Sequence, residues 1–479
     1  MWPVSRNTST PPAFLALRSS PRLIIFTVAF AIFSDIFLYA VVVPVLPFAL
    51  TSRVGIEEKD VQTWVSVSLA VFGGALLIAA PIWGYFADRY QNRRIPMLIG
   101  LVILVGSTVL LCLVMNIPML IVARILQGFA GGMTWTVGLA LIIDSVDPKN
   151  IGKELAWTSI AHSLAVFSGP ILGGIIYNHS GYYAVYAVCF GILGFDIVMR
   201  LAIIERKDAK RFGQQSEQST NELEPVTMQS TAVDSQAKAE YPSMDKHSPA
   251  TVHTSPRNPR PRKSFIGELA NLLRKPRLLA AMLGTAVQGI VQTGLESTIP
   301  LFVAGTFGWD STGAGLIFLP LVMPTMLSPI VGALGDRYGP KWLCTSGFLL
   351  ITPFAISLRF VTENSIEQKV RLCALLACIG VGLALVFSPL TAEMSWAVEE
   401  DANEDDGSAP PYAQSYGLFN VAFSVGAIIG PLLGGALREH YGFGTVGWVF
   451  GVITFVTAIV QLLWIGGNLF PRKQLITNA

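Results

Sequence analysis

Two short phrases occur twice in this chain, in the same order. The phrase Gly84-Tyr-Phe-Ala-Asp-Arg-Tyr returns as Gly332-Ala-Leu-Gly-Asp-Arg-Tyr, and Gly169-Pro-Ile-Leu-Gly-Gly returns as Gly430-Pro-Leu-Leu-Gly-Gly. One repeated phrase is weak evidence, but two pairs in the same order indicate a duplicated unit. The chain is therefore expected to fold as two equivalent halves.

The composition places most of the chain in lipid. Of its 479 residues 52% are hydrophobic and only 13% are charged, where a soluble domain has about 25% charged residues. The net charge of +2 does not indicate a nucleic-acid partner. The five cysteines include no C-x-x-C pair, and no catalytic triad, metal set or nucleotide motif is evident. We therefore expect no enzyme activity, cofactor, metal or disulfide framework.

Twelve apolar segments are each long enough to cross about 30 Å of hydrocarbon as a helix. They lie at about 23–50, 62–86, 95–115, 118–143, 154–177, 182–204, 277–304, 312–335, 341–361, 370–397, 412–437 and 443–468. The predicted fold is an all-α membrane protein with twelve transmembrane helices. They form two six-helix bundles, at residues 23–204 and 277–468.

The basic residues predict which ends face the cytosol. If the chain crosses the membrane twelve times, most of the 33 Lys and Arg fall in segments on the same side of the membrane. Cytoplasmic segments are the ones enriched in Lys and Arg, so both termini and the central segment are predicted to lie inside the cell. Residues 1–22 and 469–479 are predicted cytoplasmic tails. Residues 205–276 are polar and poor in large apolar side chains, so we expect a disordered cytoplasmic linker. The plasma membrane is the expected location, with a vacuolar or vesicular membrane as alternatives, and the protein is expected to be a monomer.

The first repeated phrase is a candidate gate. It forms tight basic turns after the second and eighth segments, where an Asp pairs with a helix end and Arg side chains lie among lipid headgroups. A pairing that breaks and reforms suits a gate; a topological anchor alone is the alternative. The candidate gating residues are Gly84, Asp88, Arg89, Arg93, Gly332, Asp336 and Arg337.

The second repeated phrase falls in the fifth and eleventh segments. Its proline removes a backbone donor and favours a kink, and its glycines allow close helix contact, so it predicts either a hinge or small-residue packing. The residues concerned are Gly169, Pro170, Gly173, Gly174, Gly430, Pro431, Gly434 and Gly435.

Charged residues in the middle of apolar segments are candidate binding groups. Asp35 lies near the middle of the first segment, where an ionised carboxylate costs at least about 2.5 kcal/mol. A carboxyl group that alternates between protonated and ionised forms, or exchanges its proton for cargo, would explain its presence. Arg124 in the fourth segment either balances Asp35 or stabilises the proton-coupling centre, and structural pairing alone is the alternative. Asp196 and Arg200 are four residues apart and are expected to pair with each other.

A polar stripe occupies one face of the seventh segment. Gln288, Gln292 and Glu296 recur every four residues and should face a wet cavity rather than lipid. Glu296 is a candidate for proton or substrate binding, and for the two glutamines interhelical hydrogen bonds are the alternative. Asn420 either binds substrate or packs between helices. His162 is expected to be a neutral, packed residue rather than a pH sensor.

These motifs resemble the major facilitator superfamily. The turns after the second and eighth segments are similar to its G-x-L-x-D-R-x-G-R-K signature, although the first copy has Phe86 and Gln91 at two of the signature positions. Arg124-Ile-Leu-Gln-Gly resembles the R-x-x-Q-G signature of its proton antiporters. The phrase at Gly169 resembles the antiporter signature of its twelve-helix drug exporters.

Three further stretches resemble the vesicular amine and acetylcholine transporter branch. They begin at Asp35, Gly294 and Asn420. Where that branch has a lysine in the second helix and aspartates in the tenth and eleventh, this chain has apolar residues near Phe72, then Phe387 and Asn420.

The resemblance implies a secondary transporter with its site between the two halves. The expected function is proton-coupled antiport or efflux of small organic compounds such as drugs, toxins or secondary metabolites, in a fungal host. A vesicular or vacuolar amine/proton exchanger and a nutrient uniporter or symporter remain as alternatives. The expected partners are a small-molecule substrate, protons and the bilayer.

Overall fold

The computed structural model describes residues 15–89, 93–146, 151–204, 274–404 and 412–466, and the regular structure within them is helical. Eleven of the helices there are long and apolar enough to cross a membrane. This confirms the all-α membrane fold. The helices are α1 Leu15–Arg18, α2 Pro21–Ala49, α3 Glu58–Arg89, α4 Arg94–Cys112, α5 Ile117–Ser145, α6 Ile151–Ser180, α7 Tyr182–Ala202, α10 Pro276–Phe307, α11 Ser311–Leu316, α12 Phe318–Val322, α13 Ser328–Tyr338, α14 Pro340–Ser357, α15 Ile366–Glu404, α16 Tyr412–Tyr441 and α17 Phe443–Trp464.

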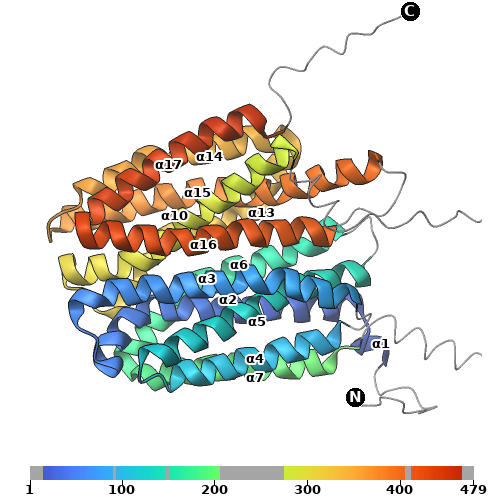
Figure 1. The fold of residues 1–479 in the computed structure, drawn as a ribbon, viewed down its shortest axis with the longest axis horizontal. Helices are drawn as coiled ribbons and strands as arrows, with labels where there is room; N and C mark the ends of the chain where they lie inside the picture. The colour runs from blue at the N-terminus through green and yellow to red at the C-terminus, as the bar shows by residue number, and fades with distance from the viewer. Residues whose placement is uncertain (1–14, 90–92, 147–150, 205–273, 405–411, 467–479) are drawn as a thin grey trace, which may run out of the picture.

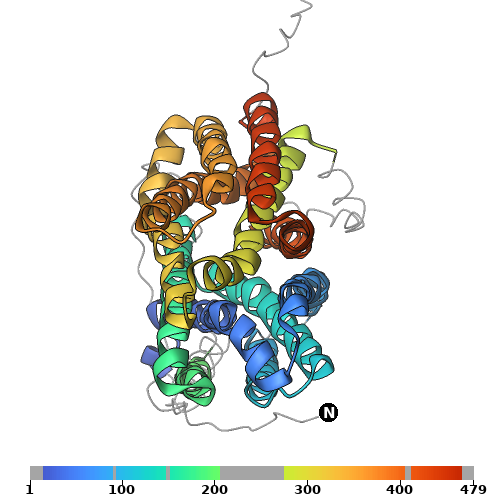
Figure 2. The ribbon, with the colours of Figure 1, turned by 90° about the vertical axis from the view of Figure 1, so that its left-hand side faces the viewer.

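The long helices run side by side in two groups (Figure 1). The first group is α2 to α7 and the second is α10 to α17, and an end-on view separates them clearly (Figure 2). We call the end at which α7 finishes and α10 begins the linker end, and the opposite end, which carries residues 50–57, the far end. The termini of the described chain both lie at the linker end (Figure 1).

Helix α2 illustrates how the sequence sets an element. The Ser20 hydroxyl accepts a hydrogen bond from the Leu23 N–H at 3.3 Å, and Pro21 occupies the first turn, where a missing N–H costs nothing. At the far end a π-helical turn over Leu50–Val54 follows, and it ends at Gly55 with φ of 73°. Asp35 therefore lies in the middle of a continuous helix.

The eighth span differs from the expectation of one helix at 312–335. The chain there is divided into α11, α12, a 3₁₀ turn over Met323–Leu327, and α13. Pro320 and Pro324 supply no N–H to the helical ladder, and this explains the interruption. The single continuous helix predicted for this segment is therefore wrong, and the segment is not among the eleven helices that are each long and apolar enough to cross a membrane.

The glycines of the second repeated phrase lie at close helix contacts. A Cβ at Gly173 would collide with the Val41 backbone of α2, and one at Gly430 would collide with the Ile290 backbone of α10. The last glycine of each phrase contacts the other group, Gly174 against Ser311 and Gly435 against Ser66. Close packing by small residues thus holds α6 on α2 and α16 on α10, whereas the hinge remains a prediction.

Candidate functional site

A cavity lies between the two groups of helices. Its empty volume is about 1280 Å³, including the part open to solvent. Helices α2, α3, α5 and α6 line it from the first group, and α10, α12, α15 and α16 line it from the second. Of the six predicted binding residues, five line this cavity, namely Asp35, Gln288, Gln292, Glu296 and Asn420.

Asp35 lies in the cavity wall with almost no exposure. Its side chain is 2% exposed, and its Oδ2 would lie 3.0 Å from a Cβ placed on Gly131 of α5. The glycine thus leaves room for the carboxyl group between α2 and α5. Oδ1 of Asp35 has no hydrogen-bond partner among the described residues. A buried carboxyl oxygen without a partner is costly, so this atom is available to a proton, water or cargo.

Glu296 accepts hydrogen bonds on both carboxyl oxygens. The Tyr39 hydroxyl of α2 donates to Oε2 at 2.8 Å, and the Gln292 amide donates to Oε1 at 3.2 Å. The first bond joins the two groups of helices. Sequence reasoning missed Tyr39, although its position four residues after Asp35 on the same helical face was a usable signal.

Arg124 is fully buried beside the cavity but does not line it. Its Nε donates to the Ser68 hydroxyl at 3.0 Å and its Nη1 donates to the Gln127 side chain at 2.8 Å. The guanidinium carbon lies 5.9 Å from the centre of the Tyr39 ring. Within the described residues it forms no ion pair with Asp35, so its closest link to the cavity runs through Tyr39.

A row of aromatic side chains crosses the cavity wall. His162 of α6 lies edge-on to Trp135 at 5.7 Å and stacks on Phe387 of α15 at 5.4 Å. Phe419 and Phe423 of α16 continue the row. His162 is packed as predicted, yet it also faces the cavity, and its Nδ1 has no partner among the described residues.

The remaining polar stripe residues occupy the same wall. Gln288 is 2% exposed and its Oε1 has no partner in the described part of the chain, while Asn420 is 6% exposed on α16. Among the described lining residues the charged side chains are the carboxylates Asp35 and Glu296, and neither Lys nor Arg is present. The electrostatics of the cavity therefore favour protons and neutral or cationic molecules over anions.

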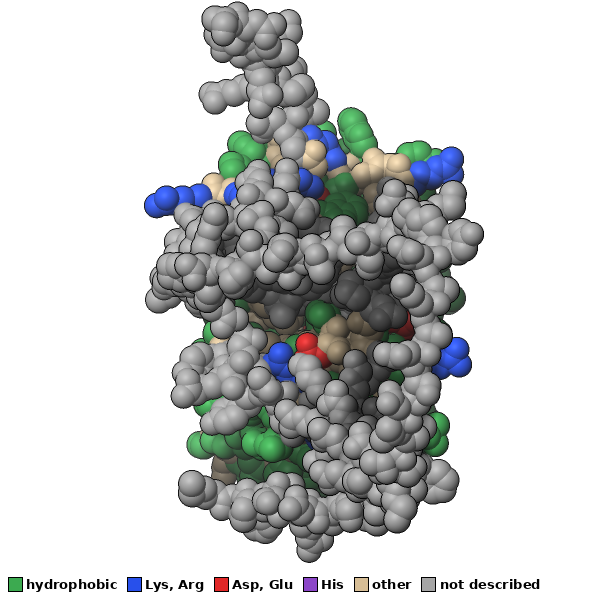
Figure 3. All heavy atoms as spheres, turned by 90° about the vertical axis from the view of Figure 1, so that its right-hand side faces the viewer, with side chains coloured by type: hydrophobic (Ala, Val, Ile, Leu, Met, Phe, Trp, Pro, Cys, Tyr) green, Lys and Arg blue, Asp and Glu red, His purple; other side chains and the backbone are tan. Residues whose placement is uncertain are grey.

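Polar contacts between the two groups close the far end. Arg438 of α16 donates to the Gln62 side chain at 2.8 Å, and Gln62 in turn donates to the Ser297 carbonyl at 3.1 Å. Thr63 donates to Glu439 at 2.8 Å nearby. Figure 3 shows the molecule from the opposite, linker end, where Lys and Arg side chains are visible at the surface. The polar contacts correspond to a state that is closed at the far end.

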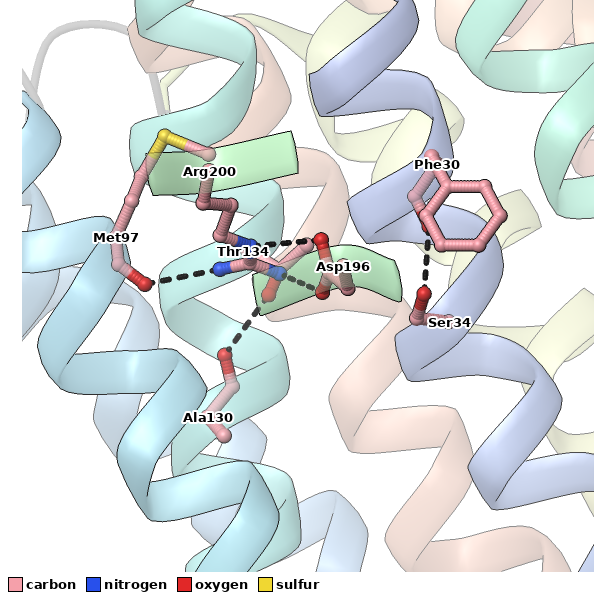
Figure 4. Close-up of polar contacts among 7 residues, drawn as sticks. All are labelled: Phe30, Ser34, Met97, Ala130, Thr134, Asp196 and Arg200. Atoms are coloured by element: carbon pink, nitrogen blue, oxygen red, sulfur yellow. Dashed lines mark hydrogen bonds and ion pairs between the residues drawn. The ribbon is translucent and has the colours of Figure 1, made fainter. Parts of the chain in front are cut away.

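Asp196 and Arg200 pair as predicted (Figure 4), and neither residue lines the cavity. The two residues of α7 form a two-pronged ion pair with N–O distances of 2.8 and 3.0 Å, and Arg200 also donates to the Met97 carbonyl at 2.9 Å. Both side chains are at most 1% exposed. The pair holds α7 against α4.

The structure describes only part of the predicted gates. Arg93 pairs with Asp144 at 3.3 Å, and a Cβ at Gly332 would lie 3.0 Å from the Ser388 hydroxyl. The Arg337 guanidinium lies 5.3 Å from the Tyr338 ring. The side chains of three predicted gate residues lie outside the described ones, namely Asp88, Arg89 and Asp336. Gly84 lies in α3 with partial exposure.

The sequence was compared with models of known protein families and with known proteins, and both comparisons gave matches along most of the chain. The model of the Major Facilitator Superfamily matches residues 28–402. The chain is 33% identical to an uncharacterized MFS-type transporter of Schizosaccharomyces pombe over 89% of this chain and 92% of that one. It is 23% identical to the multidrug resistance protein MdtG of Escherichia fergusonii, over 91% and 92% of the two chains. It is 25% identical to the human vesicular acetylcholine transporter, over 89% and 70%.

The solved structures agree on the fold. A D-xylose-proton symporter superposes with a TM-score of 0.67 at 13% identity, covering 93% of this chain and 98% of that one. At this identity the likeness concerns the fold alone.

Proposed function

Because this chain belongs to the major facilitator superfamily of membrane transporters, we propose that it exchanges protons for small organic compounds across the membrane. The two groups of helices rock around the cavity, so that the cavity faces one side and then the other. Drugs, toxins or secondary metabolites are the proposed cargo, and export is the proposed direction. The proposed location is the plasma membrane, with the linker end in the cytosol.

The observation that carries this proposal is the pair of buried carboxyl groups in one cavity. Asp35 and Glu296 come from different groups of helices, and each is at most 7% exposed. Burial away from water favours the neutral form of a carboxyl group, so each of them has reason to bind a proton in an empty cavity. A cargo molecule that takes over the hydrogen bonds of a carboxylate competes with that proton. Such competition links the two fluxes in opposite directions.

The lining of the cavity supports organic cargo. Aromatic side chains from both groups offer stacking surfaces, and a few polar atoms lie between them. Sugar-like nutrients need many hydrogen-bond partners, and this largely apolar wall provides few. This feature favours export of organic compounds over the nutrient uniporter or symporter.

A vesicular or vacuolar amine exchanger is the second candidate. The two carboxylates, and the absence of Lys and Arg from the described lining, suit a cationic amine. The acetylcholine transporter among the relatives supports the same candidate by its name. This candidate would carry an amine across a vesicular or vacuolar membrane, whereas the first exports organic compounds across the plasma membrane. Both would exchange their cargo for protons.

The test begins with an untargeted comparison of compounds retained by cells with and without the protein. The compound that changes most is then followed in vesicles containing the full chain under an imposed proton gradient. Asp35→Asn and Glu296→Gln should each abolish proton-driven flux while the protein stays in the membrane. Glu367→Gln, at an exposed far-end position, is the matched control.

The outcomes separate the candidates. Flux that ignores the proton gradient would indicate a uniporter, and flux in the same direction as the protons would indicate a symporter. Uptake of amines into acidified vesicles would favour the second candidate. Normal coupled flux in Asp35→Asn would remove that residue from the mechanism.

A further inference from the structure

Tyr39 forms a hydrogen bond that connects the two groups of helices. The acceptor of this bond is the carboxyl group of Glu296, a titratable residue in the cavity wall. Its hydroxyl donates to Glu296 Oε2 at 2.8 Å across the boundary between α2 and α10. The other described side-chain hydrogen bonds between the two groups end elsewhere. Arg438 to Gln62 and Ser311 to the Gly174 carbonyl lie at the far end, and Ser163 donates to the Thr325 backbone carbonyl at 3.5 Å in the cavity wall. A change of charge on Glu296 therefore acts directly on a contact that holds the groups together.

The Tyr39 ring is held in place independently of this bond. It packs on Phe72 of α3 with ring centres 4.6 Å apart. The buried guanidinium of Arg124 on α5 lies 5.9 Å from the centre of the Tyr39 ring. Its neighbours therefore fix the ring, and the hydroxyl is presented to Glu296. Loss of the hydroxyl should leave the ring where it is.

The charged and titratable neighbours of Glu296 are few in the described part of the chain. Helix α2 contributes Tyr39 and Asp35 to the cavity, and α6 contributes His162. Helices α3, α12, α15 and α16 contribute uncharged lining side chains, and Arg124 of α5 lies behind Tyr39. Tyr39 is the member of this set that donates directly to Glu296.

An exchanger must not change orientation while its site is empty, because an empty return wastes the gradient. A hydrogen bond to an ionised carboxylate is about twice as strong as one between neutral groups. With Glu296 ionised and no cargo bound, the Tyr39 bond is therefore at its strongest. It then holds the far end closed.

We propose that Tyr39 is the positioning residue that prevents the empty, ionised carrier from rocking, and that a proton or cargo on Glu296 releases this restraint. The inference rests on the proposed proton exchange and adds to it the group that enforces coupling. It assigns Tyr39 a role in coupling rather than in binding cargo.

A distance measurement without cargo tests the inference. Spin labels are placed on the full chain at Lys59 and Tyr441, exposed far-end positions in the two groups, after replacement of the five native cysteines. In the labelled protein with Tyr39 and Glu296 unchanged, acidification should lengthen the distances between the labels as the far end opens. In Tyr39→Phe the long distances should already be present at neutral pH, and the response to acid should be lost.

Two further variants complete the test. Glu296→Gln should behave at neutral pH like the acidified protein, and adding Tyr39→Phe to it should cause no further shift. Tyr177→Phe is the matched control, because its hydroxyl contacts Ser52 at 3.2 Å within the first group and its response to acid should be unchanged.

The results separate the two proposals. If the unmodified site shows no response to acid, both the proton exchange and the role of Tyr39 are wrong. If the unmodified site responds, Glu296→Gln does not, and Tyr39→Phe responds like the unmodified site, only the inference about Tyr39 is overturned. A lower thermal stability of Tyr39→Phe with an unchanged acid response also overturns it, because that pattern indicates a structural role alone.

Discussion

Gln62 and Arg438 form a hydrogen bond of 2.8 Å between α3 and α16 at the far end of the molecule. Gln62 is 3% exposed and also donates to the Ser297 carbonyl and to the Ser66 hydroxyl. One amide therefore connects three helices from both groups. It is the central polar contact of the closed far end.

Replacing Gln62 should favour opening of the far end. Gln62→Ala leaves Arg438 and the Ser297 carbonyl without this partner, so the closed state loses stability relative to the open one. The measurement is the distance between far-end spin labels in the two groups, which should lengthen. Gln368→Ala is the control, since Gln368 bonds to the Thr362 N–H within the second group. An unchanged distance in Gln62→Ala would show that this contact does not hold the far end.

Adding a methyl group at Gly131 should disturb Asp35. The new Cβ would lie 3.0 Å from Oδ2 of Asp35, closer than ordinary contacts, so the carboxyl group must shift. We expect Gly131→Ala to reduce transport strongly at unchanged protein level, measured as flux per molecule in vesicles. Gly106→Ala, with no atom within 4 Å of its Cβ, should transport normally. Full activity in Gly131→Ala would mean that the position of Asp35 is not critical.

Removing the Glu393 carboxylate should destabilise the second group. Glu393 is fully buried, accepts two hydrogen bonds from Arg277 at 2.5 and 3.1 Å, and accepts one from the Gly466 N–H at 3.0 Å. Glu393→Ala should cost roughly 2–3 kcal/mol because these donors lose a buried acceptor. The check is the apparent melting temperature in detergent, which should fall by several degrees.

Glu367→Ala is the control for that comparison. Glu367 and Arg371 are also 2.5 Å apart, but their side chains are 79% and 41% exposed. An exposed pair of this kind contributes little, so the melting temperature should not move. Equal losses in Glu367→Ala and Glu393→Ala would contradict the argument from burial.

The Asp196–Arg200 pair should show a different pattern. Asp196→Ala leaves Arg200 buried without its counter-ion and should cost about 3 kcal/mol. Replacing both residues, with Asp196→Leu and Arg200→Met, removes the buried charges together and should restore most of the melting temperature. If the double variant is less stable than Asp196→Ala, the argument is contradicted. The ion pair would then contribute more to the stability of the fold than compensation of two buried charges.

Much of the architecture could be predicted because its causes are local. Apolar segment length, the positions of proline and glycine, and the repeated phrases are properties of short stretches, and they predicted the twelve crossings. The eighth span shows the limit, because its apolar length is a property of the stretch alone, whereas the break in the helix depends on the combined effect of Pro320 and Pro324. Asp35 and Glu296 were found because a carboxyl group in an apolar segment needs a reason to be there.

The sequence by itself determined that this chain is a two-part helical membrane protein with carboxyl groups inside the membrane, since hydropathy and charge act residue by residue. Only the tertiary structure decided which groups meet. Tyr39 reaches Glu296, and Arg277 reaches Glu393, across long stretches of chain, while Arg124 lies behind the cavity instead of in it. Those contacts depend on how helices rotate and pack against one another, and no periodicity along a single helix specifies its partners.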